Sequence, residues 1–593
     1  MCGIYLYANL KSIFTSNITE NKENKTNYNN PFNSLAHRGP DDFKNIKIEN
    51  ENISLSFYRL AIVGDQNISQ PFEKNGVYVV ANAEIYNYKH LRMIYGIPEN
   101  EMKTGSDCEI ILHLYLKLGI EKLVNLLDGE FAFVIIDTNT KQIYFARDIF
   151  GIKPLYYNLT QDELFISSEI KGIYTNANHV LPRKIYNLSY LSNLSNKPIL
   201  SILDYYILKY EPNPYSSNFK IYQSLRLAVE KRIKQANENV EVGFLLSGGL
   251  DSSLTTSLAL EYYSKQQNKY KPHLYTIGFE EKAPDIISAK IMIEWFKNKY
   301  GPDSFYWHLV ILPISKGINA LSNVIWHLET YDTTTIRAST PMFLLSQYIK
   351  ENTPNVKIII SGEGSDELFG GYLYFNYAPN NFAFRSEIIH LLNNLYLYDV
   401  LRADRTTAAF SLEIRPPFLD KELIETVLTS SNLVYDNNYT KKLLRDCIKP
   451  YNLLPESILY GKKEAFSDAV GYSWKNSISK YCNELYGNIN ELYGNINELY
   501  GNINELYGNI NEKYKNFSNL SQEKILEHKF YENILNITKI IPETDEQYHY
   551  QKIFYQHFGN QFYLLNQYWL PNQQWIKTGS EPSATILNCY KKE

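Results

Sequence analysis

The chain has 593 residues and a formal net charge of −5, from 59 Lys and Arg against 64 Asp and Glu. Hydrophobic residues make up 44 % of it and charged residues 21 %, which excludes a largely disordered chain and allows roughly two to four domains of ~150 residues each. The charge also excludes a strongly basic chain of the kind that binds nucleic acid or anionic membranes through its overall field.

Neither membrane nor secretion signals are visible. No apolar run reaches the ~18 residues needed to span a bilayer, and the N-terminal stretch lacks the positive flank and cleavage site of a signal peptide. The cysteines are odd in number and scattered, which favours neither a disulfide framework nor a CxxC metal site. We expect a protein of a reducing compartment, most simply the cytosol. The cysteines are Cys2, Cys108, Cys447, Cys482 and Cys589.

Residues 1–190 are predicted to form a β-rich domain. Short apolar or alternating runs are separated there by turn residues, and one helix, 106–119, is expected to end at Gly119. This pattern favours antiparallel sheets over βαβ units. The expected strands are 53–63, 76–86, 130–137, 142–148 and 163–169.

After a predicted linker, 191–218, the rhythm changes to alternating helices and strands. This order predicts an α/β domain with a parallel sheet over 219–593. The expected strands are 240–246, 273–279, 308–313 and 357–361, and the expected helices are 219–236, 254–266, 285–299 and 318–329.

Four identical ELYGNIN heptads occupy 484–511. Their Ile and Leu have a spacing compatible with a coiled coil, but each heptad also contains a Gly, which costs a helix ~1 kcal/mol relative to Ala. The sequence favours a low-complexity insertion over 483–519, with a marginal helix as the alternative. No chemistry is expected there.

The N-terminal segment predicts an amidase site. Removal of Met1 would give Cys2 both a thiol nucleophile and an α-amino base with a pKa of ~7.7–8.0. Arg59 can hold a carboxylate, Glu84 and Asp107 can hold an α-ammonium group, and Asn82 can donate its side-chain amide to an oxyanion. A free amino acid with a side-chain amide fits this set, which means glutamine, with ammonia as the product.

This part of the chain resembles the glutaminase domain of class II glutamine amidotransferases, through CGI at 2–4, HRGPD at 37–41, the RLAIV segment and RDIFGIKPLYY at 147–157. The resemblance implies an αββα fold like that of Ntn hydrolases. The family usually has Asn-Gly-Glu where this chain has Asn82-Ala83-Glu84, so Ala83 would be strained if the site required a positive φ. In that case Ala83→Gly should raise thioester formation. The implied glutamine-binding residues are Arg59, Leu60, Ala61, Ile62, Val63, Asn82, Ala83, Glu84 and Asp107.

A Gly- and Ser-rich loop, LLSGGLDSS at 245–253, lies between an expected strand and an expected helix. Such a loop lets backbone N–H groups approach a phosphate at a helix N-terminus, and it lacks the lysine of kinase-type loops. It resembles the pyrophosphate-binding loop of ligases that split ATP between its α and β phosphates. A second loop, SGEGSDELFGGY at 361–372, follows another expected strand.

These loops contain candidate catalytic and metal-binding side chains. Asp251 and Asp366 suit Mg²⁺ on pyrophosphate. Glu363 has two open roles, either positioning an acyl-adenylate or acting as base when ammonia attacks it. A cation is also needed opposite the phosphates, and its candidate, Lys463 in KKEAFSD at 462–468, lies outside both loops and rests mostly on family resemblance. The segment ETYDTTTIRASTPM at 329–342 places hydroxyl groups around Arg337, which suits carboxylate or phosphate recognition.

Together with 405–420 and 464–474, these segments resemble the synthetase domain of glutamine-dependent asparagine synthetases, over about 1–475 and more weakly at 545–554 and 581–585. The resemblance implies a ligase that uses ATP and Mg²⁺ to adenylate aspartate, and joins it to ammonia from glutamine. Neither nucleic acid nor a membrane is expected as a partner, and a homodimer is an open expectation. The implied catalytic residues are Cys2, Asn82, Glu363 and Lys463; the implied ATP-binding residues are Leu246, Ser247, Gly248, Gly249, Asp251, Ser252, Ile277, Ser361 and Gly362.

Three other functions stay open at this point. A cyclase like β-lactam synthetase shares the layout but lacks an N-terminal Cys nucleophile. A non-catalytic protein of the same fold would be expected to have lost Cys2, Asp251 or Glu363, and none is lost. A plain glutaminase would leave the SGGLDSS and SGEGSDE loops unexplained.

Overall fold

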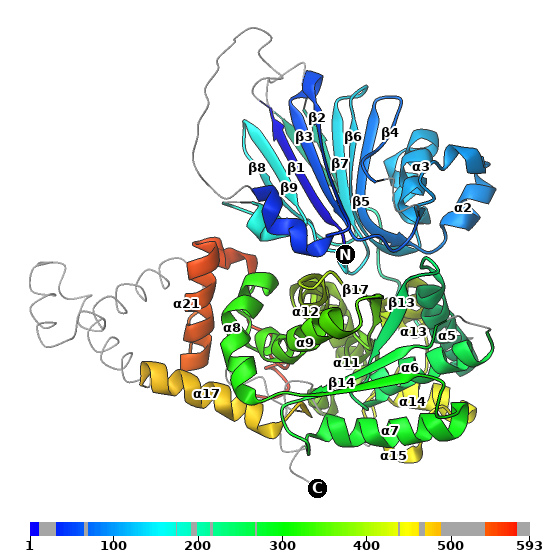
Figure 1. The fold of residues 1–593 in the computed structure, drawn as a ribbon, viewed down its shortest axis with the longest axis vertical. Helices are drawn as coiled ribbons and strands as arrows, with labels where there is room; N and C mark the ends of the chain where they lie inside the picture. Colours follow the sequence, from blue (N-terminus) through cyan, green and yellow to red (C-terminus); the bar gives the residue numbers. More distant parts are fainter. Residues whose placement is uncertain are drawn as a thin grey trace, which may run out of the picture.

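The computed structural model describes residues 1–10, 31–64, 69–173, 175–190, 198–213, 217–266, 270–436, 439–461, 469–487 and 540–577. Lys463, Cys589 and the repeats from residue 488 onward lie outside the described residues. A β-rich domain lies above an α/β domain in Figure 1, and the N-terminus lies where the two meet.

Within the described residues, the N-terminal domain contains two antiparallel sheets, ordered β10-β8-β9-β1-β3-β2 and β12-β11-β7-β6-β5-β4. They pack face to face, because Leu6 and Phe57 of the first sheet share a core with Val134 and Phe145 of the second. The strands are β1 Gly3–Asn9, β2 Asp42–Ile48, β3 Ile53–Arg59, β4 Phe72–Lys74, β5 Val77–Ile85, β6 Gly129–Asp137, β7 Gln142–Arg147, β8 Tyr156–Leu159, β9 Glu163–Ser167, β10 Asn178–His179, β11 Lys184–Ser189 and β12 Ile199–Asp204.

Helices flank these sheets. Helix α3 (Ile110–Leu118) packs on β4 and β5, helices α2 (Tyr88–Ile94) and α4 (Ile120–Leu126) pack against α3, and the 3-10 helix η1 (Pro31–Arg38) packs on β1 and β3. The predicted helix 106–119 is confirmed as a 3-10 turn that runs into α3 and stops at Gly119, whose φ is 77°. The prediction of an antiparallel α+β domain is confirmed.

Strand β12 lies within the segment predicted as a linker, 191–218. It pairs antiparallel with β11, from Ser189 opposite Ile199 to Lys184 opposite Asp204. The second sheet therefore continues past the predicted boundary at residue 190. The Asn- and Ser-rich residues around this strand obscure it in the sequence, because both residue types are typical of loops.

The C-terminal domain is built on a parallel sheet, which in the described residues has the order β15-β14-β13-β16-β17. Both faces are buried: Ile358 and Ile360 of β16 belong to one core, and Ile359 belongs to the other. This explains the continuous apolar runs in the sequence, which are typical of parallel strands covered on both sides. The strands are β13 Glu241–Leu245, β14 His273–Gly278, β15 Tyr306–Ile311, β16 Val356–Ile360 and β17 Glu413–Arg415.

Helices cover both faces of this sheet (Figure 1), and the predicted α/β class is confirmed. The four predicted helices correspond to α5, α6, α7 and α8. The α-helices of this domain are α5 Asn218–Lys234, α6 Leu250–Ser264, α7 Pro284–Tyr300, α8 Ile314–Leu328, α9 Thr333–Asn352, α10 Ser365–Phe369, α11 Asn381–Asn394, α12 Asp399–Ala408, α13 Lys421–Leu428, α14 Lys442–Ile448, α15 Glu456–Leu459, α17 Tyr472–Tyr486 and α21 Asp545–Phe558.

The first ELYGNIN repeat begins inside a helix. Helix α17, which packs against α21, runs to Tyr486, and Gly487 ends it with a φ of 69°. The repeat's own Gly is thus a helix stop, in keeping with its low helix propensity. The described part of the chain contains no helix that is long and apolar enough to cross a membrane.

Candidate active sites

Cys2 lies just before β1, at the junction of the two domains (Figure 1). Its backbone N–H donates to Asn82 Oδ1 at 3.0 Å, and the Leu60 N–H approaches its Sγ at 3.5 Å. Burial raises the pKa of the Cys2 thiol. The thiol therefore needs a base if it is to act as a nucleophile at neutral pH.

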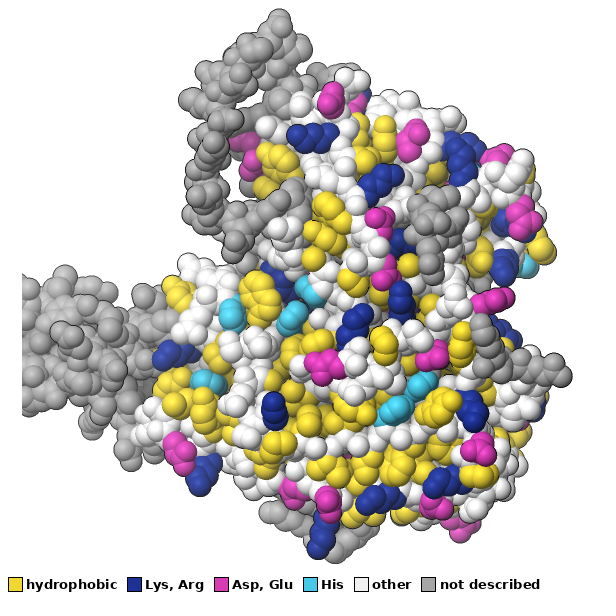
Figure 2. All heavy atoms as spheres, in the orientation of Figure 1, with side chains coloured by type: hydrophobic (Ala, Val, Ile, Leu, Met, Phe, Trp, Pro, Cys, Tyr) yellow, Lys and Arg dark blue, Asp and Glu magenta, His cyan; other side chains and the backbone are white. Residues whose placement is uncertain are grey.

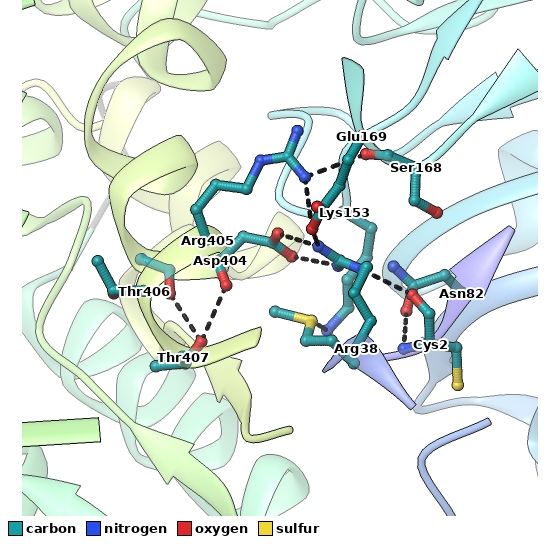
Figure 3. A network of polar contacts seen from close by, with 12 residues as sticks. Cys2, Arg38, Asn82, Lys153, Ser168, Glu169, Asp404, Arg405, Thr406 and Thr407 are labelled. Carbon is teal, nitrogen blue, oxygen red and sulfur yellow. Dashed lines mark hydrogen bonds and ion pairs between the residues drawn. The ribbon is translucent and has the colours of Figure 1, made fainter. Parts of the chain in front are cut away.

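Asn82 lies on β5, next to Cys2, and its side chain is fully buried (Figure 3). Its Oδ1 accepts the Cys2 N–H, but its Nδ2 has no hydrogen-bond partner among the described residues. A buried amide donor left without a partner costs about 1–3 kcal/mol. Its persistence beside the thiol fits a donor reserved for a bound oxyanion.

Ala83 does not meet the condition for strain. It lies inside β5, opposite Phe131 of β6, and it is not among the residues with positive φ. The hypothesis that Ala83 is strained is therefore wrong, because an extended strand residue has no need of the freedom of Gly. The expected gain from Ala83→Gly loses its basis.

The segment from Arg59 to Val63 lies against the thiol. Arg59 ends β3, is buried, and donates to the Val63 carbonyl at 3.4 Å, while the Ala61 N–H donates to Asp41 Oδ2 at 2.7 Å. These bonds close the segment into a compact turn. The structure thus brings the predicted residues Arg59, Leu60, Ala61, Ile62 and Val63 together beside Cys2 and Asn82.

Glu84 and Asp107 are both buried, and each already has partners. Glu84 forms an ion pair with Arg415 at 2.8 Å and accepts a hydrogen bond from Gln235 Nε2 at 3.1 Å. Asp107 accepts from the Ile85 N–H at 2.6 Å and from the same Gln235 nitrogen at 2.9 Å. Burial raises the pKa of Asp107 to about 6 and the pKa of Glu84 well above its ordinary range. Gln235 and Arg415 come from the C-terminal domain, and the sequence pointed to neither.

The first Gly-rich loop joins the end of β13 to the N-terminus of α6. Gly248 has a φ of 81°, and a Cβ there would lie 2.2 Å from the Ala289 nitrogen, so only Gly fits. Ser247 and Ser252 brace the loop through a 3.0 Å hydroxyl contact. The backbone N–H groups of a helix N-terminus are a ready site for phosphate.

The second loop, after β16, lies against the first. A Cβ on Gly362 would lie 2.9 Å from the Asp251 Cβ, so a Gly is needed for the two loops to approach. Both loops line a cavity of about 660 Å³ at the carboxyl ends of adjacent parallel strands, where ligands bind in open α/β sheets. All the predicted ATP and metal residues line it: Leu246, Ser247, Gly248, Gly249, Asp251, Ser252, Ile277, Ser361, Gly362 and Asp366.

A lysine that sequence reasoning missed lies between the two predicted metal ligands. The Lys441 ammonium is 2.5 Å from Asp251 and 2.7 Å from Asp366, and the lysine is almost fully buried. The two carboxylates therefore converge on one cation-sized position. No cluster of three or more His, Cys, Asp or Glu side chains suited to a metal occurs in the described residues. Two carboxylates fit Mg²⁺, which takes its remaining ligands from phosphate and water.

Glu363 lies in the same cavity and is held by a cation. Arg402 of α12 contacts Glu363 at 2.6 Å and Asp399 at 2.8 Å. Burial raises the pKa of Glu363 although Arg402 opposes that shift. Arg402 is the second cavity residue that sequence reasoning missed.

Part of the hydroxyl-rich segment 329–342 lines the synthetase cavity, through Thr334, Thr335, Ala338 and Met342. Most of it belongs to α9, where Thr340 bonds back to the Ile336 carbonyl at 2.9 Å. Arg337 is paired with Glu546 of α21 at 2.6–2.7 Å, so the expectation that it recognises a carboxylate or phosphate ligand is wrong. Pairing with α21 explains this arginine, and packing against α8 and α12 explains the helix.

A buried ionic network crosses the junction of the domains (Figure 3). Arg38, from the HRGPD motif, donates to the Cys2 carbonyl at 2.9 Å and binds both oxygens of Asp404 at 2.9 and 3.0 Å. It also contacts Glu169 at 2.6 Å, and Glu169 in turn contacts Arg405 at 2.9 Å. Arg38 thus connects the backbone of Cys2 to helix α12, whose Arg402 forms the ion pair with Glu363.

The exposed charges are mixed. On the face drawn in Figure 2, basic and acidic side chains are interspersed over both domains and neither kind gathers into a patch. This matches the net charge of −5.

Comparison with known proteins gives matches over both domains. A family model described as a glutamine amidotransferase domain matches residues 1–203, and one described as asparagine synthase matches 220–389 and 378–536. A probable glutamine-hydrolysing asparagine synthetase of Acanthamoeba polyphaga mimivirus is 38 % identical over 492 residues, 77 % of this chain and 85 % of that protein. The glutamine-hydrolysing asparagine synthetases of Cricetulus griseus and Brassica oleracea are 39 % and 38 % identical, over 75 % and 76 % of this chain and 82 % and 76 % of theirs.

Proposed function

The chain belongs to the family of glutamine-hydrolysing asparagine synthetases, and from this premise we propose which residues perform each half of the reaction. The enzyme is an ATP-dependent ligase that makes asparagine with nitrogen from glutamine. The family membership leaves a plain glutaminase, a cyclase and a non-catalytic protein without support.

The first half-reaction is proposed to take place at Cys2. Its Sγ attacks the side-chain amide carbon of glutamine, the C–N bond breaks, and the nitrogen leaves as ammonia after taking up the thiol proton. The resulting γ-glutamyl thioester is hydrolysed by water to glutamate and the free thiol. Asn82 Nδ2 donates to the oxyanion, a role supported by its lack of another partner within the described part of the chain.

The base for this step is proposed to be the α-amino group of Cys2, which exists only when Met1 has been removed. The Cys2 nitrogen already bonds to Asn82 Oδ1. Burial lowers the pKa of the amino group of Met1 to about 5, and an amino group on Cys2, the next residue of the same segment, would be subject to the same kind of desolvation. The intact mass of the purified protein tests this, since it should lack the mass of one Met; a retained Met1 in fully active enzyme would contradict it.

We propose that Arg59 binds the glutamine carboxylate and that Glu84 and Asp107 bind its α-ammonium. The main support is that all three are buried beside Cys2 and Asn82, where a guanidinium suits a carboxylate and two carboxylates suit an ammonium group. Leu60, Ala61, Ile62, Val63 and Ala83 would form the walls of this pocket.

The second half-reaction is proposed to take place in the cavity of the C-terminal domain. The loop from Ser247 to Ser252 would hold the phosphates of ATP at the N-terminus of α6, and Leu246 and Ile277 would contact the adenosine, with Ser361 and Gly362 alongside. Asp251 and Asp366 would hold Mg²⁺, which, when bound, supplies positive charge to the pyrophosphate leaving group. The Lys441 ammonium group lies between the same two carboxylates, Asp251 and Asp366, and is a positive charge that the protein itself supplies there.

An aspartate carboxylate oxygen attacks the α-phosphate of ATP, which gives β-aspartyl-AMP and pyrophosphate. Ammonia then attacks the acyl carbon, AMP leaves and asparagine forms. Glu363 keeps two proposed roles, positioning the acyl-adenylate or accepting the proton that ammonia loses. Lys463, outside the described residues, remains the proposed second cation.

One observation carries this assignment: two separate candidate sites, one with a nucleophile and one with a nucleotide-sized cavity, lie on one chain and share a buried ionic junction. The test supplies purified protein with MgATP, aspartate, and either glutamine or ammonium. We expect pyrophosphate release only when aspartate is present, with asparagine formed from either nitrogen source. Pyrophosphate release without aspartate would contradict the assignment.

Several expectations stay proposals. They are the division into 1–190, a linker over 191–218 and 219–593 with an insertion at 483–519, a homodimer, a cytosolic location and the absence of a nucleic-acid partner. Sedimentation of the purified protein tests the homodimer. Its elution from a heparin column tests the absence of a nucleic-acid partner, since a chain with a net charge of −5 should elute at low salt.

A further inference from the structure

One side chain of the C-terminal domain reaches into the proposed glutamine pocket. Helix α5 ends at Lys234, and Gln235 follows it as the first non-helical residue. Its Nε2 lies 3.1 Å from Glu84 Oε2 and 2.9 Å from Asp107 Oδ2. A single nitrogen thus bridges the two carboxylates of the other domain.

Hydrogen bonds hold the backbone at Gln235 and at Asn237, and they fix the direction of the Gln235 side chain. Its carbonyl accepts from Arg415 Nη1 at 2.7 Å. Two residues later, the Asn237 N–H donates to the Ile62 carbonyl at 2.8 Å, and its side-chain nitrogen donates to the Gly64 carbonyl at 3.0 Å. The segment 235–237 therefore forms hydrogen bonds both to the 59–64 turn and to the carboxylates of Glu84 and Asp107.

The position of Nε2 is the one that an α-ammonium group would take. It is a nitrogen with two hydrogens, one directed to each carboxylate, and it lies between the residues proposed to bind the substrate's charge. The amide is neutral, however, whereas an ammonium group is a full positive charge with three donors. Charge-assisted hydrogen bonds are roughly twice as strong as neutral ones, so the substrate would outcompete the amide for this place.

We propose that Gln235 is a positioning residue that holds the ammonium-binding position in the ligand-free enzyme and must yield it to glutamine, so that the C-terminal domain sets the affinity of the N-terminal site. This rests on the proposed role of Glu84 and Asp107 in binding glutamine. In the ligand-free enzyme the Gln235 amide donates a hydrogen bond to each of the two carboxylates. Glutamine must displace this amide to bind, and that displacement reduces the net affinity for glutamine.

The test replaces Gln235 by Met, which has a similar length and no N–H donor. A matched control is Gln347→Met on α9, where the glutamine side chain pairs only with the exposed Glu351 at 2.9 Å. KM and kcat for glutamine hydrolysis are measured for both, and each rate is normalised to the ammonium-dependent rate of the same variant to reveal any general damage. With its competitor removed, glutamine should show a KM about three- to tenfold lower in Gln235→Met, with little change in kcat, because one charge-assisted contact is no longer contested.

An unchanged KM, or a KM that rises because the amide is itself a ligand of the substrate, would overturn the inference. Gln235→Glu supplies a second readout, since a third carboxylate should move the acid limit of glutamine use to higher pH. Asp107→Asn tests the proposed ammonium site separately from the role of Gln235. If it fails to raise the KM for glutamine, the proposed ammonium site is wrong; if it raises the KM while Gln235→Met has no effect, only the role of Gln235 is wrong.

Discussion

At the scale of single residues, the buried Asn82 amide is the feature most closely tied to chemistry. Its oxygen holds the Cys2 N–H while its nitrogen has no partner in the described structure. Asn82→Asp keeps an acceptor for Cys2 but removes the donor. We expect kcat for glutamine hydrolysis to fall on the order of 10²–10³-fold, as for the loss of one oxyanion donor, while ammonium-dependent synthesis continues. A fall of less than threefold would contradict the role of Asn82.

Asp107 predicts a pH dependence. Burial raises its pKa to about 6, although the hydrogen bond from the Ile85 N–H and the charge of Arg415 act in the opposite direction. The pKa of the neighbouring Glu84 is also raised, mainly by burial. Only the ionised form attracts an α-ammonium, so binding is fully supported above the pKa and is lost as the pH falls through it. Below pH ~6 the KM for glutamine should therefore rise by up to about tenfold per pH unit.

The control for this pH dependence is Asp107→Asn, which should have a high KM at neutral pH and a flatter profile between pH 5 and 7. The measurement is glutaminase activity at a series of glutamine concentrations and pH values. A wild-type KM that stays constant from pH 7 to pH 5 would count against ionised Asp107 as the ammonium ligand.

At the scale of elements, the start of α14 offers a matched pair of lysines, Lys441 just before the helix and Lys442 as its first residue. Lys441 is buried between Asp251 and Asp366, whereas its neighbour Lys442 makes an exposed pair with Asp446. Lys441→Met leaves two carboxylates facing each other, and we expect synthesis to fall on the order of 10²-fold with either nitrogen source, because adenylation is common to both. Lys442→Met should change the rate by less than about twofold, since exposed pairs contribute little.

Helix α12 connects the junction to the synthetase cavity. Its Arg402 holds Glu363, and its Asp404 binds Arg38 through two oxygens in a fully buried pair. Asp404→Ala should lower the free energy of unfolding by about 3–5 kcal/mol, because it leaves a buried guanidinium short of its partner. Denaturant unfolding measures this, with Asp446→Ala as the exposed control expected at about 0–1 kcal/mol. Equal effects of the two variants would show that the junction does not stabilise the fold.

The elements also show what the sequence could and could not reveal. The motif residues Cys2, Ser247 and Glu363 were predictable because each belongs to a short contiguous pattern. Helix α9 was missed because Thr and Ser have modest helix propensity and Pro341 lies inside it; burial against two other elements overrides that tendency. Gln235 was missed for another reason, since its partner Glu84 is 151 residues away and no local pattern records the contact.

At the scale of the whole molecule, the two domains are joined by charges that belong to their sites. Arg38 ties Cys2 to α12, Arg415 pairs with Glu84, and Lys357 of β16 contacts Asp41 at 2.6 Å. The site around Cys2 is thus built partly from the C-terminal domain, whereas the residues that line the synthetase cavity belong to the C-terminal domain itself. Composition and motifs predicted two domains and two half-reactions, but this shared construction depends on contacts between distant segments.

Two sites with separate chemistry are proposed on one chain, and the Cys2→Ala variant tests this most directly. Asparagine formation by the purified variant is measured with MgATP and aspartate, once with glutamine and once with ammonium. We expect the Cys2→Ala variant to lose the glutamine-dependent reaction and to keep the rate of the ammonium-dependent reaction. Loss of both reactions, or survival of the glutamine reaction, would contradict it.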